Sequence, residues 1–121
     1  MSHTKRIPED RLAEYLDSFS RRFVMDSSPE AVDIELIGPD DIGDQVVANG
    51  ARLLGIDYDR HTKALEVLLD SGDRRVYDAR EVWTIEEPDG FISSMEIVTG
   101  DGTRHVLTIK RVGLRRWTPP R

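Results

Sequence analysis

The chain has 121 residues, of which 38% are hydrophobic and 33% are charged, and its formal net charge is −6. This length suits one domain with a single core, and the absence of cysteine excludes disulfides, thiolate nucleophiles and thiolate metal sites. No run approaches the roughly 18 apolar residues that span a bilayer, and no apolar stretch follows the first basic residues. We therefore expect a cytoplasmic protein without a signal peptide or membrane contact.

The first predicted element is an amphipathic helix over residues 8–24. Pro8 suits the first helical position, and Glu9 and Asp10 in the first turn favour the helix dipole. Apolar residues then recur at helical spacing, at Leu12, Tyr15, Leu16, Phe19 and Phe23. We expect this apolar face to pack against a sheet.

Alternating apolar and polar residues predict strands through the rest of the chain. The predicted strands cover residues 32–36, 52–58, 64–69, 76–79, 82–86, 91–98 and 104–110. Residues 45–48 form at most a short strand, because Asn49-Gly50 predicts a break. Turns are expected at residues 59–63, 71–73, 88–90 and 100–102, with a corner around Ala79-Arg80.

Short connections between successive strands favour antiparallel neighbours. The predicted fold class is therefore α+β: an N-terminal amphipathic helix packed on a bent antiparallel β-meander of about six or seven strands, with a partly closed barrel as an alternative. Residues 1–121 form one domain, with loosely ordered ends at 1–7 and 113–121. The predicted inward side chains are Leu54, Ile56, Leu65, Val67, Leu69, Trp83, Ile85, Phe91, Met95, Ile97, Leu107 and Ile109.

Two groups of carboxylates and three histidines are the candidate chemical groups. Carboxylates suit Mg²⁺ or Ca²⁺, but Asp and Gly are also ordinary turn residues, so the turn interpretation is favoured for both groups. The histidines share no metal-binding spacing, and no nucleophile stands beside a base. We expect no cofactor, no metal and no catalytic activity. The groups are Asp40, Asp41 and Asp44, then Asp57 and Asp59, and finally His3, His61 and His105.

The basic C-terminal end is the one candidate for partner contact. The last 14 residues contain five basic residues and no acidic residue, although the body of the chain is acidic. Arginines beside a tryptophan can hold phosphate while the indole stacks on a base. Packing of this end on the acidic body or in a dimer is favoured over partner contact, and a disordered end is the other alternative, since Pro119-Pro120 predicts an extended terminus. The candidate residues are Lys110, Arg111, Arg115, Arg116 and Trp117.

Three segments resemble a family of small bacterial proteins, the domain of unknown function 5335. They read IPEDRLAEYLDSFSRRF, GDQVVANGARLLGIDYD and REVWTIEEPDGFISSMEIVTGDGTRHVL, and the resemblance covers roughly residues 5–110. Because no activity is established for the family, the resemblance implies no functional residues.

Three functions remain open. The favoured one is a non-catalytic interaction or scaffold domain, homodimeric through a sheet edge or the helix, because strands are complete and a catalytic constellation is lacking. The second is nucleic-acid binding through the C-terminal end alone, since an acidic body repels phosphates. The third is a small-ligand pocket between the helix and the sheet.

Overall fold

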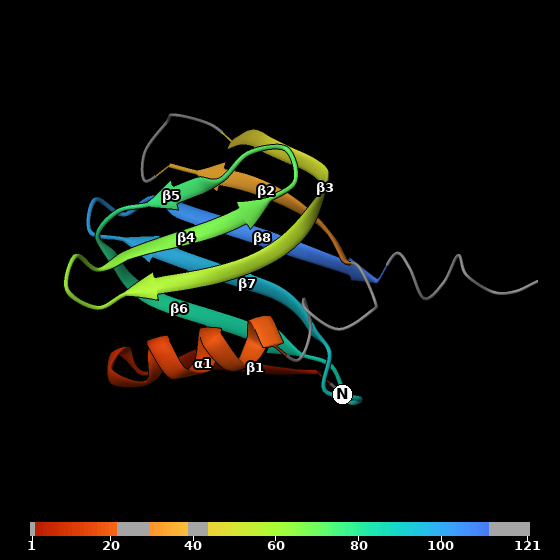
Figure 1. Cartoon of the computed structure of the whole chain (residues 1–121), viewed down its shortest axis with the longest axis horizontal. Helices are drawn as coiled ribbons and strands as arrows, with labels where there is room; N and C mark the ends of the chain where they lie inside the picture. Colours follow the sequence, from red (N-terminus) through yellow and green to blue (C-terminus); the bar gives the residue numbers. More distant parts are fainter. Residues whose placement is uncertain (1, 22–29, 39–43, 112–121) are drawn as a thin grey trace, which may run out of the picture.

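The protein folds as a short N-terminal helix on a strongly bent antiparallel sheet (Figure 1). The computed structural model describes residues 2–21, 30–38 and 44–111. A 3₁₀ turn, η1 (Glu9–Arg11), leads into α1 (Leu12–Phe19). Within the described residues the strands are β1 (His3–Ile7), β2 (Glu30–Ile37), β3 (Asp44–Asp59), β4 (Ala64–Leu69), β5 (Arg74–Val76), β6 (Ala79–Glu86), β7 (Ile92–Thr99) and β8 (Arg104–Arg111).

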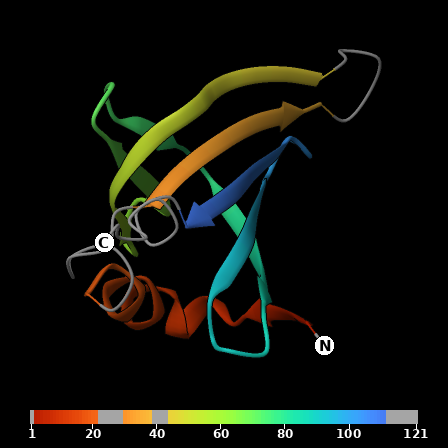
Figure 2. The ribbon, with the colours of Figure 1, turned by 90° about the vertical axis from the view of Figure 1, so that its right-hand side faces the viewer.

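The strands lie in the order β1-β6-β7-β8-β2-β3-β4-β5, and each pair of neighbouring strands is antiparallel. The predicted meander is correct within two runs, β2 to β5 and β6 to β8. The two runs are joined where β2 pairs with β8, a contact between segments far apart in the chain. The predicted alternative is a partly closed barrel; the observed sheet is strongly bent but not closed into a barrel, since β1 and β5 are its two edges (Figure 2).

Strand β1 differs from the expectation of a loosely ordered segment over residues 1–7. His3–Ile7 pair with β6 along their whole length, from His3 opposite Glu86 to Ile7 opposite Val82. Only Ile7 is buried in this strand, and the other four residues are exposed. The strand is therefore stabilised by backbone hydrogen bonds and one anchoring side chain, which leaves no alternating pattern in the sequence.

Strand β3 is continuous where the sequence predicts a break at Asn49-Gly50. It pairs with β2 through its first part and with β4 through its last part, so one long strand links β2 to the β4–β5 end of the bent sheet. Gly50 has a φ of 72°, and its N–H donates to Asp33 Oδ1 at 2.7 Å. Register shifts between β2 and β3 around this glycine accommodate the bend without ending the strand.

The predicted core is correct for nine of its twelve residues and wrong for three. Leu54 is 46% exposed, because a register shift between Leu53 and Gly55 turns it outward. Trp83 and Ile85 are half-buried, while Val82 and Thr84 of the same strand are fully buried. Both faces of β6 are partly apolar, so alternation alone could not decide its orientation. The buried nine are Ile56, Leu65, Val67, Leu69, Phe91, Met95, Ile97, Leu107 and Ile109.

A helix is confirmed, but α1 covers Leu12–Phe19 and residues 9–11 form the 3₁₀ turn η1, where the sequence predicts one helix over residues 8–24. The helix lies against β3 on the concave side of the sheet (Figure 2). Leu12, Leu16 and Phe19 are buried in the core, whereas Phe23 lies outside the described residues. Just after the helix, Ser20 Oγ accepts from the N–H of Ile56 at 3.0 Å and donates to its carbonyl at 3.1 Å. This hydroxyl fixes the helix end to Ile56, three residues before the end of β3 that η1 also meets.

Candidate ligand pocket at the helix–sheet seam

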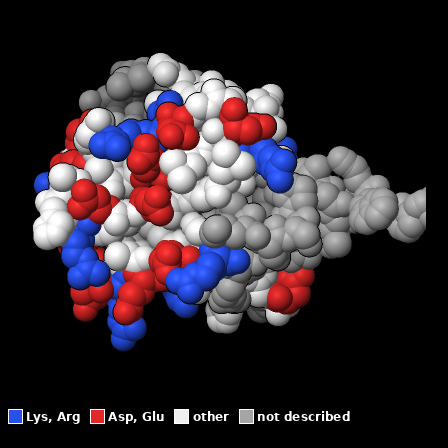
Figure 3. All heavy atoms as spheres, in the orientation of Figure 1, with Lys and Arg blue, Asp and Glu red and all other residues white. Residues whose placement is uncertain are grey.

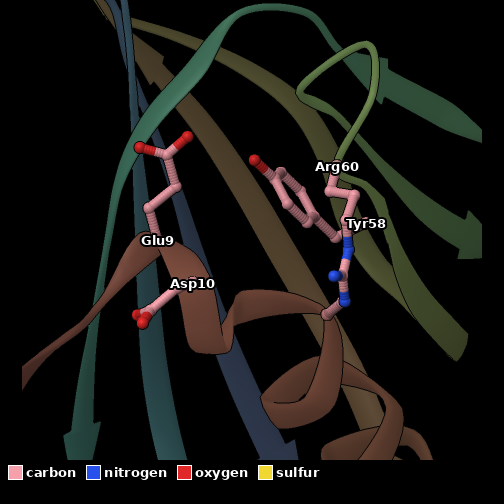
Figure 4. Close-up of a pocket in the computed structure, with 5 residues that line it drawn as sticks. Glu9, Asp10, Tyr58 and Arg60 are labelled. Atoms are coloured by element: carbon pink, nitrogen blue, oxygen red, sulfur yellow. The ribbon is translucent and has the colours of Figure 1, made fainter.

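A pocket of about 330 Å³ lies where the start of the helix meets the end of β3. One wall consists of Glu9, Asp10 and Ala13, from η1 and α1, and the other consists of Tyr58 and Arg60, from the β3–β4 hairpin (Figure 4). We call this cavity the seam pocket. Its two walls are almost fifty residues apart in sequence, so only the folded chain forms it.

The hairpin wall is held by a compact network of backbone bonds. Asp59 Oδ1 accepts from the N–H of His61 at 2.9 Å, and this bond lowers the pKa of Asp59. Lys63 has a φ of 57°, which is uncommon for a residue with a Cβ. Its N–H donates to the Asp59 carbonyl at 2.8 Å, and its own carbonyl accepts from the N–H of Ala79 at 2.9 Å. The hairpin tip is thus closed internally and tied to the start of β6.

An ion pair joins the two walls. Glu9 Oε2 lies 2.9 Å from Lys63 Nζ, which lowers the pKa of Glu9 and raises the pKa of Lys63. Arg80 lies near enough to lower the pKa of Glu9 slightly further, and its guanidinium is held by Asp78, with Nε 2.8 Å from Oδ1. Both side chains of the Glu9–Lys63 pair are about half exposed, so it orients the walls more than it stabilises the fold.

The hydroxyl of Tyr58 lies between the walls. Its oxygen is buried and has no hydrogen-bond partner among the described residues. The hydroxyl points across the pocket toward the Glu9 side chain (Figure 4). Burial, and then the Glu9 charge, raise the pKa of Tyr58, so the hydroxyl is protonated at neutral pH and can both donate and accept. Acidic and basic side chains interleave on the surface over this part of the molecule (Figure 3).

Comparison with known proteins places the chain in a family without an assigned activity. The model of a family of unknown function, DUF5335, matches residues 3–114. The chain belongs to this family. An uncharacterized protein of Aquifex aeolicus (strain VF5) is 35% identical over 109 residues, which are 88% of this chain and 92% of the relative. No solved structure matches. The resemblance seen in the sequence is confirmed.

Of the predicted partner contacts of this DUF5335 domain, Lys110 and Arg111 belong to β8 and do not line the seam pocket. Lys110 forms an ion pair with Asp33 across β8 and β2, with Nζ 2.7 Å from Oδ2. Arg111 ends β8, with its backbone opposite Glu30. Arg115, Arg116 and Trp117 lie outside the described residues. Partner contact through this end of the chain stays a prediction.

The other candidate groups form no metal-binding cluster within the described residues. Asp40 and Asp41 lie outside the described residues, and Asp44 begins β3. Over residues 2–21, 30–38 and 44–111, no three His, Cys, Asp or Glu residues are placed to hold a metal ion. His3 and His61 are exposed, and His105 is half-buried in the DUF5335 sheet. None of the helices in the described part of the chain is both long and apolar enough to span a membrane.

Sequence reasoning missed the residues of the seam pocket. Glu9 and Asp10 were assigned to the helix dipole alone, and Arg60 and Lys63 to a hairpin turn. One signal was available: in DYD, Tyr58 shares its strand face with the buried Ile56 and pairs with the buried Leu65. A hydroxyl on an inward face needs a hydrogen-bond partner. No partner for it is evident in the sequence, and this indicates a candidate binding site at the end of β3.

Proposed function

We propose that this DUF5335 domain is a non-catalytic binding module that takes a small polar ligand in the seam pocket. The proposal rests on the buried Tyr58 hydroxyl, which has no partner in the described part of the chain. A buried polar group without a hydrogen bond costs about 1–3 kcal/mol, and phenylalanine would fill the same space without that cost. A ligand that bonds the hydroxyl gives a reason for a tyrosine at this position.

The construction of the walls supports the same proposal. Lys63 and Asp78 are the two non-glycine residues with positive φ in the described chain. Both belong to the structure behind the pocket, where Lys63 binds Glu9 and Asp78 holds Arg80. Such strained conformations cluster at binding sites. The chain thus accepts local strain at the place where two distant segments meet.

The pKa shifts favour binding over catalysis. General acid–base catalysis works best when the pKa of the catalytic group lies near the working pH. Here the pKa of Glu9 is lowered by Lys63, and the pKa of Tyr58 is raised by burial. Both groups therefore keep one protonation state near neutral pH, Glu9 as a carboxylate and Tyr58 as a phenol. Fixed states suit recognition of a ligand.

The test is a titration of the ¹⁵N-labelled full chain with a panel of small polar compounds, followed by amide chemical shifts. We expect saturable shifts at Ala13, Tyr58 and Arg60, and weaker binding after Tyr58→Phe. The matched control is Tyr77→Phe, since Tyr77 is 67% exposed at the β5–β6 corner. Millimolar titrations that leave the pocket amides unmoved would count against the proposal, as would equal binding by Tyr58→Phe.

The interaction-domain and homodimer predictions stay predictions, together with the cytoplasmic location. The sheet edges lend dimerisation little support. Edge strand β1 carries exposed Lys5 and Arg6, and β5 has only three residues, two of them arginine. Charged or very short edge strands oppose pairing with another chain. Light scattering across a concentration series measures self-association directly.

A further inference from the structure

The two walls of the seam pocket carry opposite charges. The η1 wall carries the carboxylates of Glu9 and Asp10, and the hairpin wall carries the Arg60 guanidinium, which lies at the other end of the Tyr58 ring from the hydroxyl (Figure 4). A lone anion at Arg60 would face two carboxylates, and a lone cation at Glu9 would face Arg60 and Lys63. Neither kind of simple ion fits the pocket as a whole.

Part of this charge is not used within the fold. Lys63 occupies Oε2 of Glu9, and no hydrogen bond to Glu9 other than that of Lys63 is present among the described residues. Arg60 forms no ion pair with any residue in the described part of the chain, and the same holds for Asp10. A carboxylate oxygen and a guanidinium are thus unused by the fold between the walls.

The size of the pocket restricts the ligand further. Its volume of about 330 Å³ is at the lower end of the range for small-molecule sites, which is about 300–1,000 Å³. A compact ligand with both charges matches both walls at once. Charge-assisted hydrogen bonds are about twice as strong as neutral ones, so two such bonds would supply most of its affinity.

We propose that the ligand of the seam pocket is a small zwitterion of the amino-acid type. Its ammonium group binds the free oxygen of Glu9 on the side toward which the Tyr58 hydroxyl points, and its carboxylate binds Arg60. This inference rests on the proposed function, because it names the chemical class of ligand for the same pocket.

A series of ω-amino acids tests the charge pattern and measures the spacing of the two walls. Glycine, β-alanine, 4-aminobutyrate and 6-aminohexanoate are titrated into the ¹⁵N-labelled full chain, with butylamine and butyrate as the separate halves. We expect one chain length to bind best, and to bind at least about tenfold more tightly than either half, since each half makes only one charge-assisted bond.

Matched variants separate ligand contacts from support of the pocket. Glu9→Gln and Lys63→Asn both break the Glu9–Lys63 ion pair, and asparagine tolerates the positive φ at position 63. Only Glu9→Gln removes the counter-charge for the ammonium group. We expect Glu9→Gln to abolish the preference for the amino acid over butyrate, and Lys63→Asn to keep it. Arg60→Gln should abolish the preference over butylamine, whereas Arg104→Gln, on β8, should have no effect.

Three results would overturn the inference. If butylamine or butyrate binds as tightly as the best amino acid, the zwitterion is wrong while ligand binding in the pocket stands. Equal loss of the preference in Glu9→Gln and Lys63→Asn assigns Glu9 a supporting role only, and also removes the zwitterion. If no probe moves the pocket amides, the zwitterion and the proposed function fail together.

Discussion

Removing one oxygen atom from Tyr58 should make the protein more stable. The hydroxyl is buried and lacks a partner among the described residues, while the ring packs against the core. An unsatisfied buried hydroxyl costs about 1–3 kcal/mol. Because part of the Tyr58 side chain remains accessible, we take the lower limit. Tyr58→Phe is therefore expected to raise the free energy of unfolding by about 1 kcal/mol at pH 7.

The size of the thermal shift follows from chain length. An unfolding entropy of roughly 2.1 cal/mol/K per residue gives about 0.25 kcal/mol/K for a chain of 121 residues. A gain of about 1 kcal/mol then raises Tm by about 4 °C. Circular dichroism during heating and during urea denaturation measures both quantities. Tyr77→Phe, which removes an exposed hydroxyl, should leave both unchanged.

Alkaline pH gives the same prediction an independent check. The pKa of Tyr58 is raised in the folded state, so the folded protein holds this proton more tightly than the unfolded chain. The contribution of the protonated Tyr58 to the free energy of unfolding is fully present below the ordinary tyrosine pKa of 10.0, and it is lost as the pH rises through the folded-state pKa. The advantage of Tyr58→Phe over the wild type should therefore grow above pH 10.

A destabilised Tyr58→Phe variant would refute this reasoning. A loss of about 1 kcal/mol at pH 7 would mean that the hydroxyl already has a hydrogen-bond partner. The observation on which the proposed ligand site rests would then be removed.

Three further predictions concern other parts of the chain. Asp101 has a pKa of about 2, chiefly because Thr99 Oγ1 donates to its Oδ1 at 2.6 Å. Asp101→Asn should therefore lower the stability at pH 7. It should also reduce the loss of stability between about pH 4 and 2, measured by urea denaturation at each pH. The pKa of His105 is lowered by burial, so the stability of the wild type should fall as the pH drops below 6.5. His105→Leu should remove this pH dependence of stability, whereas His61→Asn, at an exposed position, should retain it. If the C-terminal end binds nucleic acid, deleting residues 113–121 should abolish a binding that weakens steeply with salt, measured by fluorescence anisotropy. Binding that survives the deletion would contradict that role.

Much of the fold follows from the sequence because its determinants are local. The spacing of Leu12, Leu16 and Phe19 predicts the buried face of the helix, and alternation predicts β4, β7 and β8 with the correct inward residues. Tight turns predict which strands are neighbours within each run. Where one face of a strand is clearly more apolar, the chain has a single way to bury it.

Sequence reasoning fails where the local pattern is ambiguous. Trp83 and Ile85 face outward, because both faces of β6 are partly apolar and the better-packed face consists of Val82 and Thr84. Leu54 is exposed because a one-residue register shift in β3 reverses the alternation. Strand β1 has no apolar pattern, since backbone pairing with β6 holds it in place.

The sequence alone determined a helix-on-sheet domain of the DUF5335 family, with most of its core. Only the tertiary structure decided that β2 pairs with β8 and that η1 meets the β3–β4 hairpin. The physical reason is distance along the chain. Helix and strand patterns arise from neighbouring residues. The seam pocket instead depends on Glu9 meeting Tyr58 and Lys63, which lie far from it in the sequence and are brought to it only when the helix packs on the bent sheet.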